Sequence, residues 1–322
     1  MDGRLAFLGI VFLILILAWV GAGVLWRAAE MAEIVAPLDP ADYDELSVVT
    51  VGTGSEFENP ERRGPATAVG LGTTVVLVDA GRGIAEGLRL AKIPVDQPAV
   101  VFLTNLLPWN TVGLDDLLVN GWLTDREAPL RVVGPTGTRS LVEGISAAHA
   151  AGNAAMAEAL GLPEDGARID VQEVRDGHTE EVGPLTIEAR ALPGGPLPTL
   201  AWRFTDGQSR IVVSGAGWGH EELASFAGGA DVLVHEAAYL PTVAELEGTG
   251  AVVEDADRID RDRALHTLID DAGRLATDAQ VDRLVLVRLR PPPFFEIQMS
   301  SLVGNTFGGE VVIAEDGELV FP

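Results

Sequence analysis

The chain has 322 residues, 47% of them apolar, so it can bury a full core as one large α/β domain or two ordinary domains. It contains no cysteine, which excludes disulfides, thiolate metal sites and cysteine nucleophiles. The formal net charge of −26 disfavours a broad interface with nucleic acid, because such a surface repels phosphate backbones.

The first 30 residues form a separate segment. The run from Leu5 to Trp26 has no charged residue, and its roughly 22 residues at helical rise would cover the hydrocarbon core of a bilayer. We expect an uncleaved membrane anchor; a cleaved signal peptide is the alternative, since Ala18–Gly23 contains small residues. One arginine precedes the run (Arg4) and one follows it (Arg27), so the flanking charges do not set its orientation in the membrane. The orientation is therefore inferred from the large acidic domain that follows. We expect a single-pass membrane protein with that domain outside the cytoplasm, in the periplasm.

Residues 31–45 read as a linker, and a globular domain is expected over 46–322. Its first strand, Ser47–Val51, runs into the glycine loop Gly52–Ser55. A nucleotide-binding loop is less favoured here than a tight turn, because the third glycine and a following helix start are missing. The next strand is Thr73–Val78, and a helix is expected around Ile84–Lys92.

A buried strand over Ala99–Thr104 leads through a short loop into a helix at Gly113–Leu123. The segment Arg131–Thr138 predicts another strand that enters a helix through a glycine turn, and Ser140–Leu160 predicts an alanine-rich helix. Further strands are expected near 168–174, 185–191, 200–205, 209–214 and 232–235.

A helix is expected over Asp260–Thr277 and a buried strand over Leu284–Val287, and short strands at 309–314 and 318–321 complete the chain. Antiparallel strand runs with interspersed βα units indicate an α/β sandwich rather than a plain doubly wound sheet.

Several short motifs recur in a fixed order after these strands. They are Val51–Ser55, Val78–Gly83, Phe102–Leu114, Val133–Thr138, Val213–Gly215, Ala230–Tyr239, His266–Thr267 and Leu284–Leu286. In this order and spacing, 46–322 resembles the metallo-β-lactamase-fold superfamily, in the branch that contains tRNase Z and the arylsulfatase-like hydrolases. The resemblance implies a four-layered αββα sandwich, and the family's members bind two zinc ions.

The family's metal ligands can be matched to this chain one position at a time. The family's T-H-x-H-x-D-H junction places its ligands at Asn105, Leu107, Trp109 and Asn110 of this chain. The next histidine of the family matches Leu192 or Pro193. The bridging aspartate matches Ala216, and the last histidine matches Arg288. Zinc takes about four nitrogen, sulfur or carboxylate donors. None of these residues is a histidine or a carboxylate, so we expect no metal cofactor.

These former metal-site positions should cluster in space. The expected cluster contains Asn105, Leu107, Trp109, Asn110, Ala216 and Arg288. A buried Arg288 must be paired, because an isolated charge in an apolar pocket is unfavourable, and its candidate partners are Asp79, Asp115 and Glu236. Leu107 and Trp109 suggest that the cleft has become apolar.

Three residues are candidate remnants of a catalytic site. His235, Glu236 and His266 match family positions that flank the substrate, and the resemblance implies that the last of these contacts the scissile phosphate or orients a proton. A carboxylate and an imidazole can act as base and acid if they lie within hydrogen-bond reach. Structural retention is the favoured explanation, since His235 ends a buried strand. Ser214 is interpreted as a turn residue rather than a nucleophile.

Three functional hypotheses follow. The leading one is a membrane-anchored pseudoenzyme without the dinuclear metal site, which binds a small apolar ligand or a protein partner and no nucleic acid. The alternative is a hydrolase of the same fold that acts on a small ester or phosphoester without metal, through Glu236 and His266. The third is a metallo-hydrolase with an unrecognised metal site, which would need Asp and Glu donors because the chain has only five histidines.

Overall fold

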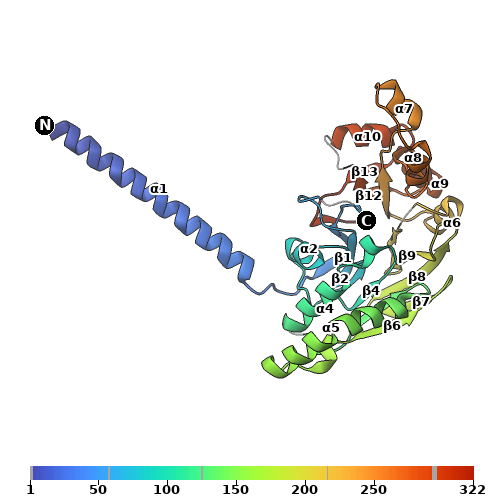
Figure 1. Cartoon of the computed structure of the whole chain (residues 1–322), viewed down its shortest axis with the longest axis horizontal. Helices are drawn as coiled ribbons and strands as arrows, with labels where there is room; N and C mark the ends of the chain where they lie inside the picture. The colour runs from blue at the N-terminus through green and yellow to red at the C-terminus, as the bar shows by residue number, and fades with distance from the viewer. Residues whose placement is uncertain (1–2, 57–58, 125, 216, 292–295) are drawn as a thin grey trace. The chain divides into compact units, whose positions relative to one another are not determined.

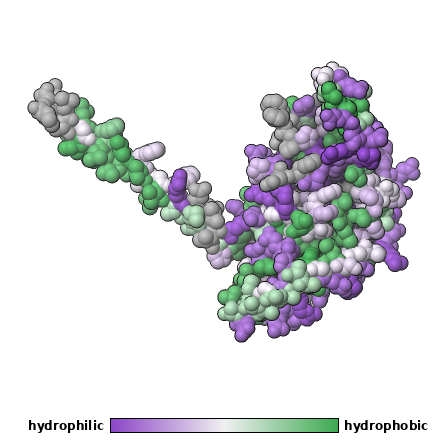
Figure 2. Space-filling view, in the orientation of Figure 1, coloured by the Kyte–Doolittle hydropathy of each residue, from purple (hydrophilic) through white to green (hydrophobic). Residues whose placement is uncertain are grey.

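The computed structural model describes residues 3–56, 59–124, 126–215, 217–291 and 296–322. The chain divides into two units, 1–39 and 40–322. The first unit contains the helix α1 (Gly3–Val35), which ends just before Pro37 because a residue that precedes proline disfavours the helical conformation. Its stretch Phe7–Ala29 is long and apolar enough to cross a membrane, by length and composition alone. Most of this helix is hydrophobic in Figure 2.

The second unit contains two seven-stranded sheets (Figure 1). In the order of pairing, the first sheet contains β14 (Glu318–Val320), β1 (Tyr43–Gly52), β2 (Ala66–Gly72), β3 (Thr74–Val78), β4 (Val100–Phe102), β5 (Leu130–Gly134) and β6 (Ile169–Glu173). The second contains β13 (Glu310–Ile313), β12 (Arg283–Arg290), β11 (Val232–Ala238), β10 (Arg210–Val213), β9 (Thr199–Thr205), β8 (Leu185–Leu192) and β7 (Thr179–Val182).

The main core lies between the two sheets. Phe102 of β4 contacts Trp202 of β9 there, with ring centroids 4.6 Å apart. Every residue of β11 is buried, because its sheet is covered on both faces, and this explains the apolar run Val232–Val234 with which the strand begins. The outer face of the first sheet packs against α2 (Ile84–Leu90) and α4 (Leu114–Thr124).

The outer face of the second sheet packs against α6 (His220–Phe226), α9 (Ile269–Ala279) and α10 (Glu296–Gly304). Helix, sheet, sheet and helix therefore follow one another, and the predicted αββα sandwich is confirmed. The remaining helices are α3 (Pro108–Thr111), α5 (Thr138–Leu160), η1 (Glu164–Ala167), α7 (Val243–Gly248) and α8 (Ala256–Arg263).

The single helix predicted over Asp260–Thr277 is wrong. Helix α8 ends at Arg263 and α9 begins at Ile269, because the intervening backbone pairs with β11 instead of continuing the helix. The carbonyl of Thr267 accepts the Ala238 N–H at 2.9 Å, and Ala238 and Leu268 form a parallel bridge. This break places two of the motif residues beside the carboxyl end of β11.

Candidate active site

The side chains at the former metal-site positions form a buried polar network. The Arg288 guanidinium donates to the carboxylate of Asp79 and to Asn110 Oδ1. Asn110 Nδ2 in turn donates to Asn105 Oδ1 at 2.7 Å. Arg288 is 8% exposed and the other three residues are fully buried. We call Asp79, Thr104, Asn105, Asn110 and Arg288 the arginine network.

Asp79 is the anion of the arginine network and sits directly after β3. It accepts the Thr104 N–H at 2.8 Å and the Thr104 hydroxyl at 2.7 Å. Burial raises the pKa of the Asp79 carboxyl above its usual range, and the charge of Arg288 with the two hydrogen bonds from Thr104 opposes that rise. Loss of Arg288 would remove the largest of these opposing effects and leave only the two hydrogen bonds from Thr104.

The structure brings together only part of the expected cluster. Asn105, Asn110 and Arg288 meet as expected, and Asp79 is the partner of Arg288. Leu107 contributes only its backbone N–H, 3.0 Å from Asn105 Oδ1, and Trp109 is half-buried in α3. The remaining member, Ala216, lies outside the described residues.

The expectation of an apolar cleft is wrong, because charged and amide side chains fill this place.

The residues present also do not fit the family's two zinc ions. The guanidinium of Arg288 is a cation without an electron pair to share, and the amides of Asn105 and Asn110 are weak zinc ligands. Among the described residues, no group of three or more histidine, aspartate or glutamate side chains could hold a metal ion.

A second polar group lies where β11 ends and α9 begins. Glu236 Oε1 accepts the backbone N–H groups of Gly217 at 2.8 Å and Thr267 at 2.6 Å. Its other oxygen, Oε2, lies 3.4 Å from His266 Nδ1. Burial raises the pKa of Glu236, but the hydrogen bond and charge of His266 outweigh it and hold that pKa below its usual range. Glu236 is therefore a carboxylate that orients His266.

His266 is held between carboxylates. Its Nε2 lies 3.5 Å from Glu56 Oε1 and 2.7 Å from an Arg290 nitrogen, and Arg290 also pairs with Asp262 at 2.7 Å. Burial lowers the pKa of His266, but Glu236 and Glu56 outweigh burial and raise it to about 9.

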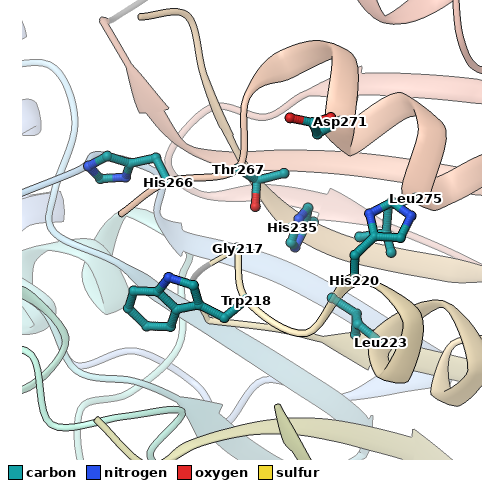
Figure 3. Close-up of a pocket in the computed structure, with 9 residues that line it drawn as sticks. All are labelled: Gly217, Trp218, His220, Leu223, His235, His266, Thr267, Asp271 and Leu275. Carbon is teal, nitrogen blue, oxygen red and sulfur yellow. The ribbon is translucent and has the colours of Figure 1, made fainter. Parts of the chain in front are cut away.

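A cavity of about 240 Å³ opens beside these residues, between α6 and α9 (Figure 3). It is lined by Gly217, Trp218, His220, Leu223, His235, His266, Thr267, Asp271 and Leu275. His235 is fully buried, and its Nδ1 lies 2.5 Å from Ser214 Oγ. Burial lowers the pKa of His235 to about 4, so its ring is neutral at neutral pH.

Sequence reasoning missed part of this cavity. Gly217, Thr267 and the Ser214–His235 contact come from separate loops and strands, so no local pattern joins them. The only signal was the pair His266–Thr267, which is one of the motifs that carry the family resemblance.

Comparisons with known proteins agree with this fold. No family model matches the chain. It is 28% identical over 280 residues to Ribonuclease Z of Mycobacterium bovis, across 84% of this chain and 96% of that protein. Ribonuclease Z of Mycobacterium sp. strain KMS is 28% identical over 279 residues, with 84% and 94% covered.

Solved structures give the same result. The metallo-β-lactamase fold protein YhfI from Bacillus subtilis matches with a TM-score of 0.66 and 18% identity, across 86% of this chain and all (100%) of that one. The short form of human tRNase Z matches with a TM-score of 0.62 and 18% identity, with 85% and 98% covered.

The pseudoenzyme hypothesis is wrong. The sequence relatives that this chain matches over nearly their whole length carry the name Ribonuclease Z, and the similar solved structures include a tRNase Z. These relatives favour the hydrolase alternative. The family's members are hydrolases, and the hydrolase alternative uses Glu236 and His266, which lie beside the cavity.

Proposed function

Because the chain belongs to the metallo-β-lactamase superfamily, in the branch that contains tRNase Z, we propose that it is a hydrolase of small phosphoesters or esters. We assign its chemistry to Glu236 and His266. The single observation that carries this proposal is the Glu236–His266 pair, held by two backbone N–H groups beside a cavity.

The pair has the charge states that acid catalysis needs. Glu236 is a carboxylate fixed on one side of the imidazole, and His266 carries a proton at neutral pH because its pKa is raised to about 9. A protonated imidazole at the cavity wall can supply a proton to the leaving oxygen and can attract an anionic phosphoryl group. Glu236 acts as the positioning residue, because its bond to Nδ1 fixes the ring.

The cavity and the charge of the chain favour a small substrate. A volume of about 240 Å³ admits a compact molecule, and a net charge of −26 opposes a long polyanion such as RNA. The name of the relatives indicates attack on a phosphodiester bond. We therefore propose a small phosphodiester as the preferred substrate class, with no nucleic-acid partner.

The reaction is proposed to need no metal, since the arginine network holds no suitable donor set.

We further propose that α1 anchors the protein in a membrane as a single span, with the domain on the extracytoplasmic side. The length and composition of Phe7–Ala29 support the anchor.

The test is turnover by the full chain in detergent micelles, after treatment with EDTA. The substrates are bis(p-nitrophenyl) phosphate, p-nitrophenyl phosphate, p-nitrophenyl acetate and a precursor tRNA. We expect the phosphodiester to be hydrolysed, and His266→Gln and Glu236→Gln to lower kcat on the order of 10²- to 10⁴-fold.

The matched control is His149→Gln, because this histidine lies on α5 and its side chain is 44% exposed. It should retain wild-type turnover. The proposal is refuted if the wild-type chain hydrolyses none of these substrates. It is also refuted if the wild type and both active-site variants have equal rates. Turnover that disappears with EDTA and returns with zinc refutes its metal-independent part.

A further inference from the structure

Two buried polar atoms on the cavity wall have no hydrogen-bond partner among the described residues. They are His235 Nε2 and Thr267 Oγ1, and both residues line the cavity in Figure 3. Buried polar atoms are nearly always hydrogen-bonded, so an orphaned pair in one cavity indicates that something else supplies the partner. The proposed function of Glu236 and His266 does not use either atom.

The contacts of Ser214 decide which nitrogen of His235 is free. Ser214 Oγ lies 2.5 Å from His235 Nδ1 and 3.5 Å from the carbonyl oxygen of Val234. The serine hydroxyl can donate to the Val234 carbonyl while its oxygen accepts the Nδ1–H of His235, and we infer this tautomer. In this tautomer Nε2 keeps its lone pair and directs it to a place where the described residues provide no donor.

The charge environment keeps that lone pair available. Burial is the main cause that lowers the pKa of His235 to about 4; Glu236 opposes it, and the charges of Arg288 and His220 add to it. His266, on the same cavity, has its pKa raised to about 9. One cavity therefore presents a neutral and a protonated imidazole, which is the arrangement that divides the roles of base and acid.

This inference rests on the hydrolase function proposed above. We propose that His235 is the general base that takes a proton from the attacking water, and that Ser214 is the positioning residue that keeps Nε2 free. The Thr267 hydroxyl is directed toward the His235 side of the cavity (Figure 3) and supplies a second hydrogen bond to that water.

The step balances with the groups present. The water oxygen forms a bond to phosphorus while the bond from phosphorus to the leaving oxygen breaks. One water proton moves to His235 Nε2, and the leaving oxygen takes a proton from the protonated ring of His266. His235 then returns its proton to solvent, and His266 regains one from solvent.

The first test is ¹⁵N NMR of the full chain with labelled histidine. We expect His235 to carry its proton on Nδ1 with Nε2 unprotonated, and Ser214→Ala to mix the two tautomers. Ser214→Thr should restore the wild-type state, because it keeps the hydroxyl. A wild-type spectrum with the proton on Nε2 overturns the proposal, since that nitrogen could then accept nothing.

The second test is the rate of phosphodiester hydrolysis against pH. His235→Gln should lower kcat on the order of 10²- to 10⁴-fold with little change in KM, and should remove the acid limb of the profile. Ser214→Ala should give a smaller loss of kcat that Ser214→Thr reverses, whereas His149→Gln should change nothing.

The outcomes separate this proposal from the function on which it rests. An active wild-type chain with full activity in His235→Gln would mean that the orphaned atoms only hold a resident water, and would overturn the base while leaving Glu236 and His266 in place. A wild-type chain that hydrolyses no phosphodiester overturns both.

Discussion

The arginine network and the cavity lie at the ends of neighbouring strands of one sheet, yet they are built in opposite ways. Arg288 on β12 reaches a carboxylate and an amide, so its charge is matched inside the protein. His235 on β11 is just as buried, but one of its nitrogens is left open to a cavity. A satisfied buried charge stabilises a fold only as part of its pair, whereas an open acceptor with a shifted pKa is typical of a site that reacts.

The largest expected effect breaks the arginine network. Arg288→Ala leaves the Asp79 carboxylate buried without its cation, and removal of one partner of a buried pair destabilises by about 3–5 kcal/mol. We expect the midpoint of urea unfolding to fall accordingly.

The double variant Asp79→Asn with Arg288→Met is the control for that change. It removes both charges, so it should unfold at a higher urea concentration than Arg288→Ala alone. If the single variant is as stable as wild type, the arginine network is not what holds this part of the fold.

The next effect concerns the pH dependence of stability through His266. A rise in its pKa from 6.5 to about 9 corresponds to about 3 kcal/mol. A histidine whose pKa is raised by folding contributes all of this below pH 6.5 and loses it as the pH rises through 9. The difference in unfolding free energy between wild type and His266→Gln should thus be larger at pH 6 than at pH 9.5; a difference independent of pH would show that the ring is not protonated.

A smaller effect is expected where the cavity wall is tightest. A Cβ on Gly217 would lie 1.8 Å from Thr267 Oγ1 and 2.5 Å from the Thr267 nitrogen. Gly217→Ala must therefore displace the backbone that binds Glu236, and overpacking of this kind destabilises by roughly 1–3 kcal/mol. Thermal unfolding and phosphodiester turnover should both decline, and unchanged values would contradict the geometry of the cavity wall.

The smallest effect has the opposite sign and serves as the matched glycine control. Gly152 lies within α5, and a Cβ there would meet no atom within 4 Å. Gly152→Ala should stabilise the protein by about 0.5–1 kcal/mol through helix propensity, and leave the cavity unaffected. A loss of stability would place a contact on that face of the helix.

Much of the fold could be predicted because its strands carry strong local signals. The apolar runs of β11 and β12 and the alanine-rich α5 stand near their predicted places. Two strands were not predicted. Strand β2 has glycine and alanine at most positions, and β7 is short and largely polar, so neither shows the alternation that marks a strand.

The site was less predictable because its contacts join distant parts of the chain. The pairing of Arg288 could be anticipated, because a buried charge needs a partner, and Asp79 was one of three candidates with Asp115 and Glu236. The break between α8 and α9 could not, because it depends on bonds from Thr267 to Glu236 and Ala238 rather than on local propensity. The tautomer of His235 likewise depends on Ser214, which is remote in sequence.

The pairing of Arg288 with Asp79 also constrains how this lineage can change. A single substitution of Arg288 by histidine would leave the Asp79 carboxylate without its guanidinium partner, at a cost of about 3–5 kcal/mol. Typical domains have only about 5–15 kcal/mol of stability in total. Substitution of one of these two residues is therefore tolerated best when the other is substituted with it.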